Sequence, residues 1–176
     1  PLSSLSEVLS RERTALVVMS SKGELLYRFP PPGAQGDPAL KAFMEQLPEF
    51  LASYQTLAGA RADLKEGRGQ AAIANLRALL AEGTGAEEPQ PLLDSVRQLA
   101  QADLDALERS SAQTLTEAEA SLASKDYQTA WVKAAPLETQ GLTTISDAVA
   151  ARFQAIKQAV AANAEALNQE KGAHRS

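Results

Sequence analysis

Two stretches decide the fold: LDSVRQLAQADLDALERSSAQTLTEAEASL (residues 93–122) and ISDAVAARFQAIKQAVAANAEAL (residues 145–167). In each stretch, apolar or small residues recur at gaps of three and four residues, and the pattern repeats every eleven residues. Eleven residues in three turns give about 3.67 residues per turn, so the stripe stays nearly straight along a helix. The stripe positions are Leu93, Val96, Ala100, Leu104, Leu107, Ser111, Leu115, Ala118 and Leu122, followed by Ile145, Val149, Phe153, Ile156, Val160, Ala164 and Leu167.

Each stretch therefore predicts a long helix with one buried face. About 30 helical residues form a rod about 45 Å long, which needs a surface of similar length to cover one face. We expect the two helices to fold back on each other as a long antiparallel hairpin with bundle-like packing. The predicted fold class is mainly α.

Composition limits the classes of partner. The 176 residues suffice for one domain with a small appendage. The absence of cysteine excludes disulfides, thiolate catalysis and cysteine-ligated metals. Residues 1–86 carry nine Lys/Arg and nine Asp/Glu, whereas residues 87–176 carry eight and thirteen, so the net charge of −5 lies on the predicted hairpin. An acidic rod repels phosphates, so we expect no nucleic acid partner. No apolar run approaches the ~20 residues of a membrane helix, so we expect no membrane partner and a cytoplasmic location.

The first part of the chain predicts a small α-β-β unit. Ser4 and Glu7 have the spacing of a capping box, which predicts a short helix to about Ser10. Residues 14–19 and 24–29 are rich in β-branched, aromatic and aliphatic residues and flank a glycine-containing turn, which predicts a β-hairpin. An isolated two-stranded hairpin is marginal in water, so we hypothesise that it pairs with the hairpin of a second chain. The candidate residues for this dimerisation module are Leu16, Val18, Leu25 and Tyr27.

Proline and glycine divide the rest of the chain. Residues 30–38 form a Pro-rich linker, and Asp37 followed by Pro38 predicts a helix start. Two helical segments follow, separated by a turn at residues 65–69, and the linker at residues 83–91 leads into the first long helix. We therefore expect three segments: residues 1–36, residues 37–83, and residues 84–176, the last with a polar tail.

Two turns resemble parts of a tetratricopeptide repeat. Gly67 with Ala72, and Lys125 with Ala130, resemble the turn and second helix of that repeat. However, Ala72 and Ala130 are 58 residues apart, whereas the repeat is 34 residues long, and the first-helix pattern is missing. We assign no family.

The sequence contains no catalytic constellation. The single histidine, His174, lies in the polar tail, so one chain cannot form a His-containing triad or a two-His metal site. We predict no catalytic residues, no metal and no cofactor. Arg61, Lys65 and Arg68 surround the 65–69 turn near a helix start, and they are candidates for a weak anion site. The alternative interpretation is a solvated turn between two helices.

Tyr127 and Trp131 are the candidate partner-binding residues. They are four residues apart on one short predicted helix that Asp126 caps and Pro136 limits, so they share a face. That face is either buried at the tip of the hairpin or an exposed anchor for a partner.

These patterns favour a non-enzymatic protein that mediates interaction or assembly through the acidic hairpin. Its expected partner is another copy of the chain, giving a homo-oligomer, or a different protein. The alternative hypothesis is a helical small-molecule or peptide-binding sensor, in which the helices of residues 39–82 and the Trp131 tip enclose a pocket. The sequence features behind this alternative are the aromatic residues Phe43, Phe50 and Tyr54 and nearby basic residues.

Overall fold

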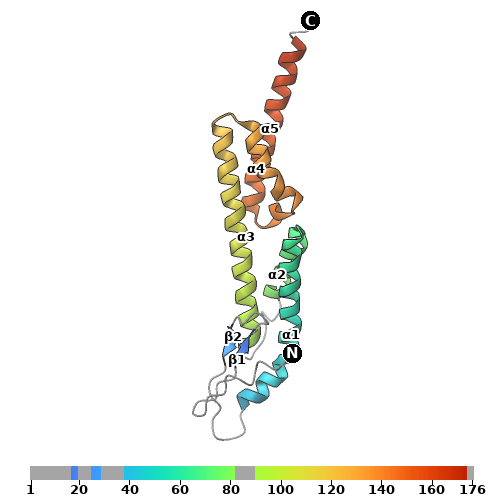
Figure 1. The fold of residues 1–176 in the computed structure, drawn as a ribbon, viewed down its shortest axis with the longest axis vertical. Helices are drawn as coiled ribbons and strands as arrows, with labels where there is room; N and C mark the ends of the chain where they lie inside the picture. Colours follow the sequence, from blue (N-terminus) through green and yellow to red (C-terminus); the bar gives the residue numbers. More distant parts are fainter. Residues whose placement is uncertain (1–16, 20–24, 29–37, 82–89, 174–176) are drawn as a thin grey trace.

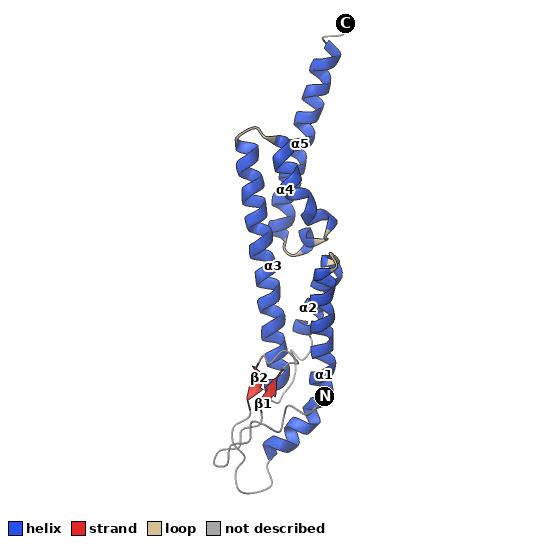
Figure 2. Ribbon diagram, in the orientation of Figure 1, coloured by secondary structure: helices blue, strands red, loops and turns tan. Residues whose placement is uncertain are grey.

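The described part of the chain is mainly helical. The structure is a computed structural model that describes residues 17–19, 25–28, 38–81 and 90–173. Two short strands precede the helices (Figures 1 and 2). The elements are β1 (Val17–Met19), β2 (Leu25–Arg28), α1 (Pro38–Lys65), α2 (Gly69–Ala81), α3 (Pro91–Ala123), α4 (Tyr127–Thr139), the 3-10 helix η2 (Leu142–Thr144) and α5 (Asp147–Ala173).

The longest helix, α3, is the spine of the molecule. Figure 1 shows α1 and α2 beside its first half and α4 and α5 beside its second half. The two helix pairs therefore lie one after the other along α3, and η2 lies where they meet. A 33-residue helix is about 50 Å long, which is long enough to contact two successive pairs of shorter helices.

The prediction that the two long helices form an antiparallel hairpin is wrong. The chain reverses after α3 and again after α4, so α5 runs in the same direction as α3 (Figure 1). The antiparallel partner of α3 is α4, which has 13 residues. The physical reason is that the second reversal, at Gly141 with its φ of +70°, returns the chain only halfway down α3.

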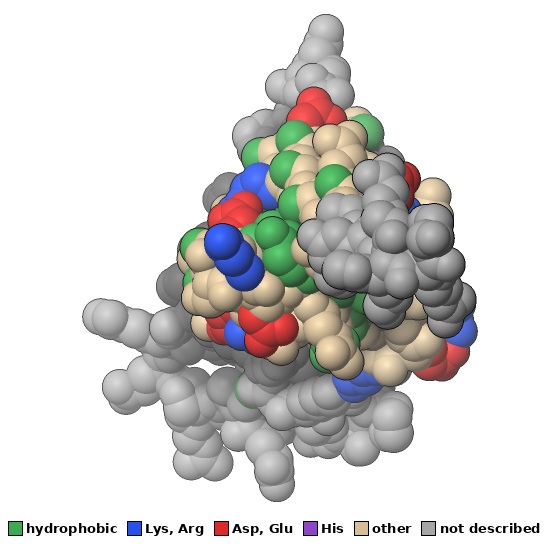
Figure 3. Space-filling model, turned by 90° about the horizontal axis from the view of Figure 1, so that it is seen from above, with side chains coloured by type: hydrophobic (Ala, Val, Ile, Leu, Met, Phe, Trp, Pro, Cys, Tyr) green, Lys and Arg blue, Asp and Glu red, His purple; other side chains and the backbone are tan. Residues whose placement is uncertain are grey.

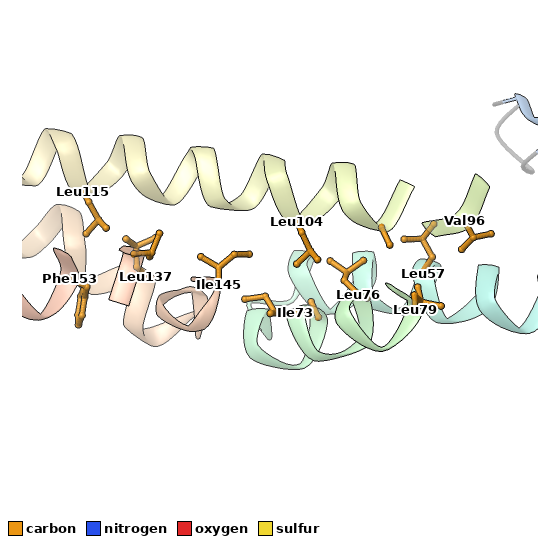
Figure 4. Packing of buried hydrophobic residues seen from close by; sticks show 14 of the residues in the cluster. Leu57, Ile73, Leu76, Leu79, Val96, Leu104, Leu115, Leu137, Ile145 and Phe153 are labelled. Atoms are coloured by element: carbon orange, nitrogen blue, oxygen red, sulfur yellow. The ribbon is translucent and has the colours of Figure 1, made fainter. Parts of the chain in front are cut away.

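The predicted stripe on α3 is confirmed as its buried face. Seven of its nine positions are buried, and Leu107 and Leu122 are partly buried. The second stripe is buried from Ile145, which precedes α5, to Ile156, partly buried at Val160 and exposed at Ala164. Because the stripe is straight, one face of α3 packs against both helix pairs. Figure 4 shows Leu104 between Ile145 of the second pair and Leu76 of the first, and one buried cluster includes residues of all five helices.

The two helical turns share a conformation. After α1, Gly67 has a φ of +75°, the Arg68 N–H donates to the Asp63 carbonyl and the Gly67 N–H donates to the Leu64 carbonyl. After α3, Lys125 has a φ of +59°, and the same two bonds recur from Asp126 and Lys125. Each is a Schellman turn, which normally uses glycine at the left-handed position.

The start of α4 confirms one capping prediction, whereas its end corrects another. The Asp126 carboxylate accepts the N–H of Thr129 at 3.0 Å. Hydrogen bonding to the Thr129 side chain, and then to this N–H, lowers the pKa of Asp126. Pro136 was expected to limit the helix, but α4 continues to Thr139. Proline removes one N–H, which would bond the carbonyl four residues earlier. That residue, Val132, lies on the exposed face, where water can satisfy the carbonyl.

The strands form a two-stranded antiparallel pair in the described part of the chain. The Cα partners are Val17 with Arg28, Val18 with Tyr27 and Met19 with Leu25, with a register irregularity after Val18. The predicted helix before the strands, the predicted turn between them and Leu16 lie outside the described residues. The strand pair lies near the start of α3 (Figure 1).

Candidate functional site

An open groove lies between α1 and α3, and we call it the α1–α3 groove. It has a volume of about 650 Å³. Its lining is mostly apolar or small, and several of its side chains are exposed. The lining residues are Tyr54, Leu57, Ala58, Arg61, Ala62, Leu64, Lys65, Asp103, Ala106 and Leu107. Small residues on both walls, such as Ala58 and Ala106, allow another helix to approach closely.

A bidentate ion pair crosses the groove. Arg61 Nε of α1 donates to Asp103 Oδ2 of α3 at 2.6 Å, and Arg61 Nη2 donates to Asp103 Oδ1 at 3.2 Å. Both side chains retain partial exposure, 33% and 24%. Bidentate pairing of a guanidinium with a carboxylate restrains both groups. The pair therefore restrains α1 relative to α3 and places two charged groups in a lining that is otherwise mostly apolar.

The three candidates for an anion site do not lie free around one position. Arg61 is paired with Asp103, and Arg68 donates to Asp63 at 2.9 Å from its Nε and to Glu66. Hydrogen bonding to Asp63, then to Glu66, raises the pKa of Arg68. Carboxylates of the protein thus already occupy donors that an anion would need. Lys65, the last residue of α1, is exposed and lines the groove.

Trp131 packs within the second helix pair. Its ring centroid lies 6.1 Å from that of Phe153 on α5, with the planes tilted by 40°, and its side chain is partly buried. Tyr127, in the first turn of α4, is also partly buried. The large apolar side chain that α4 exposes is the neighbouring Val132, at 64%. Trp131 thus contributes to packing, and α1 and α3, without α4, line the groove.

The residues that join the two helix pairs were not identified from the sequence. A Cβ on Gly69 would lie 2.3 Å from the Gln140 carbonyl oxygen, and one on Gly141 would lie 2.8 Å from Gln70 Cβ. Across the same joint, Arg77 Nη2 donates to the carbonyls of Thr144 and Ile145, at 3.1 and 2.9 Å. The absence of side chains at two glycines therefore allows the start of α2 to contact the turn before η2.

Charged side chains elsewhere link the helices. Glu119 on α3 is paired with Arg152 on α5, and this hydrogen bonding lowers the pKa of Glu119. Lys157 on α5 donates to Glu138 on α4 at 2.7 Å. Viewed from the C-terminal end, acidic and basic side chains lie next to each other among hydrophobic and polar ones (Figure 3). Within the described residues, no group of three or more His, Asp or Glu is arranged to hold a metal ion.

Comparisons with known proteins supply no family. Neither protein-family models, nor curated proteins, nor solved structures gave a match to this chain. None of the helices in the described ranges has the length and apolar character needed to cross a membrane. Functional inference therefore depends on the geometry of the chain itself.

Proposed function

We propose that this chain is a non-enzymatic protein that mediates protein–protein interaction or assembly, with the α1–α3 groove as its docking surface. The observation that carries the proposal is the groove itself, which is open, mostly apolar and lined by two rigid helices. Protein interaction sites often combine exposed apolar side chains with a few charged ones, as this groove does. An amphipathic helix placed in an apolar groove is a common recognition mode.

The ion pairs between the helices support an assembly function. Arg61, Glu119 and Lys157 each form an ion pair between two helices. The shifted pKa values of Glu119 and Asp126 follow from an ion pair and a helix cap. Each of these groups has a structural partner, which accounts for its position without a catalytic role.

The strand pair is the second part of the proposal. We retain the hypothesis that it is a dimerisation module, because two short strands have few stabilising contacts of their own. Met19, at the end of β1, is 48% exposed. The backbone edges next to Val18 and Tyr27 are the positions at which strands of a second chain would pair.

A groove substitution tests the docking function. The full chain with Ala106→Arg places a long charged side chain on an exposed position of the groove, so the fold should be retained. The matched control is Ala74→Arg, at an exposed position of α2 that does not line the groove. Partner proteins are first captured from the native host with the wild type and with Ala74→Arg. After purification, we expect these partners to bind the wild type and Ala74→Arg but not Ala106→Arg. If purified partners bind both variants equally, the groove is not the docking surface.

The sensor hypothesis remains the second candidate, because Tyr54 and several aliphatic side chains line the same groove. A ligand that prefers the native state raises its unfolding temperature. A thermal-shift screen with metabolites and short helical peptides distinguishes the two functions. Stabilisation by a metabolite or a short peptide that Ala106→Arg abolishes would favour the sensor, whereas no stabilisation by any of these ligands, together with groove-dependent capture of a protein, favours assembly.

A further inference from the structure

The C-terminal part of α5 is a helix without a neighbour in the described part of the chain. Arg152 of α5 is paired with Glu119, close to the end of α3 at Ala123. From Arg152, α5 continues for 21 residues to Ala173, whereas α3 continues for only four residues beyond Glu119, so the last part of α5 extends past the α3–α4 turn (Figure 1). Ala161, Ala162, Ala164 and Glu165 are exposed on this segment, which we call the α5 projection.

An isolated helix of this length is marginal in water. Most helices in proteins gain their stability by packing one face against another element. The exposed alanines allow such packing at a short interaxial distance. The α5 projection therefore has the form of an element that docks on another surface.

We infer that the α5 projection of one copy docks in the α1–α3 groove of a second copy, giving a reciprocal dimer. This inference rests on the proposed function of the groove and specifies its occupant. The groove has small residues on both walls, and the projection exposes small residues, so the two surfaces match in size. Lys65 at the end of α1 and Glu165 on the projection are both exposed and have opposite charges.

The spacing of the two surfaces along α3 fits a closed dimer. Along α3, the groove lies at residues 103–107, and the α3–α4 turn lies about 20 residues further on, or about 30 Å. Two copies of the chain whose α3 helices lie side by side and antiparallel can then each place the α5 projection in the α1–α3 groove of the other copy. The two-fold axis lies midway between groove and projection, near Leu115 to Ala118 of α3. Because the exchange is reciprocal, this interface by itself closes as a dimer.

Engineered cysteines test this dimer cleanly, because the chain contains no cysteine. Ala106→Cys places a thiol in the groove and Ala164→Cys places one on the projection, both at exposed positions. Within one chain these positions are separated by more than about 30 Å along the length of α3 and α5, whereas a disulfide requires Cα atoms within about 7 Å. A disulfide between positions 106 and 164 can therefore form only between copies.

The experiment mixes the two single variants of the full chain under mild oxidation. We expect a mixed disulfide dimer in several-fold higher yield than from Ala164→Cys mixed with Ala74→Cys, whose thiol lies outside the groove. Light scattering of the wild type is expected to give a mass above that of a monomer at high micromolar concentration. Equal yields from the two mixtures, a predominance of 164–164 dimers, or a strictly monomeric wild type would each overturn the inference. Groove-dependent capture of a different protein would then still support the proposed function.

Discussion

The guanidinium of Arg152 on α5 donates to both carboxylate oxygens of Glu119 on α3, at 2.8 Å from Nε and 2.7 Å from Nη2. The same side chain donates to Thr116 Oγ1 at 2.8 Å and to the Ala112 carbonyl at 3.3 Å. One arginine therefore contacts two turns of α3. These contacts fix the axial position of α5 in the parallel orientation that the sequence did not predict.

Removal of this side chain should weaken the packing of α5. We expect Arg152→Ala to lower the free energy of unfolding by about 1 kcal/mol, because both partners are partly exposed and solvent screens their attraction. Lys133→Ala is the matched control, since the Lys133 Nζ lies 3.7 Å from Glu117 and contributes little. Denaturant unfolding measures both variants. If both variants lowered the free energy of unfolding equally, Arg152 would not be the residue that fixes the axial position of α5.

The same pair predicts a pH dependence. The pKa of Glu119 is lowered in the folded chain, so its contribution to stability is present above the unfolded pKa of about 4.3. That contribution is lost as the pH falls through the folded pKa. We expect the stability difference between wild type and Glu119→Gln to shrink towards zero below pH 4, as measured by denaturant midpoints. A constant difference between pH 7 and pH 3 would contradict the assigned pairing.

Lys125 occupies a backbone conformation that glycine adopts at less cost. With a φ of +59°, it costs roughly 1 kcal/mol relative to glycine. We therefore expect Lys125→Gly to raise the free energy of unfolding by about 1 kcal/mol and Lys125→Ala to leave it nearly unchanged. Gly67→Ala, at the equivalent position of the first turn, should lower it by a similar amount. Thermal unfolding of the three variants is sufficient, and a stabilising Gly67→Ala would be inconsistent with the shared Schellman turn.

Gly141 is expected to be sensitive to substitution. Its φ is +70°, and a Cβ would lie 2.8 Å from Gln70 Cβ and 2.9 Å from the Gln70 nitrogen. Gly141→Ala should therefore destabilise the chain by about 2–4 kcal/mol through strain and overpacking. A Cβ added to Gly59, inside α1, would have no neighbour within 4 Å, so Gly59→Ala should stabilise by about 0.5–1 kcal/mol. Denaturant unfolding measures the change in the free energy of unfolding for both variants. If Gly141→Ala stabilised the chain as Gly59→Ala should, the close contact between the two helix pairs would be contradicted.

Ser111 leaves a polar atom without a partner in the core of the described chain. Its side chain is 1% exposed, and its Oγ has no hydrogen-bond partner. An unsatisfied buried hydroxyl costs about 1–3 kcal/mol, so Ser111→Ala should stabilise the chain by about 1 kcal/mol. Ser110→Ala, at the adjacent exposed position, should change stability by less than about 0.5 kcal/mol. A destabilising Ser111→Ala would show that the hydroxyl has a partner in solution.

The sequence predicted elements well and their spatial arrangement less well. The stripe on α3, the start of α1 at Pro38 and the Asp126 cap depend on neighbouring residues and were correctly predicted. The parallel course of α5 depends on contacts distant in sequence, such as Gly69 with Gln140 and Arg77 with Ile145. Periodicity carries no information about such contacts, because it identifies a buried face and not the element that covers it.

The groove was missed for the same reason. Tyr54, Ala58, Arg61 and Lys65 have a spacing that places them on one face of α1, which could have identified that wall from the sequence. The opposite wall, around Ala106, becomes apparent only when α1 is placed against α3. Aromatic residues are frequent at interfaces, which favoured Tyr127 and Trp131 as candidates, yet Trp131 packs on Phe153.

The central claim, that the α1–α3 groove is used for protein association, is tested most directly by photo-crosslinking in the native host. A photoreactive amino acid replaces Ala106 in the groove or, as the control, Ala74 on α2, both of which are exposed. The proposal predicts a discrete crosslinked species from position 106, either with a second copy of the chain or with one other protein, and none from position 74. No adduct at position 106 above the level at position 74 would contradict it.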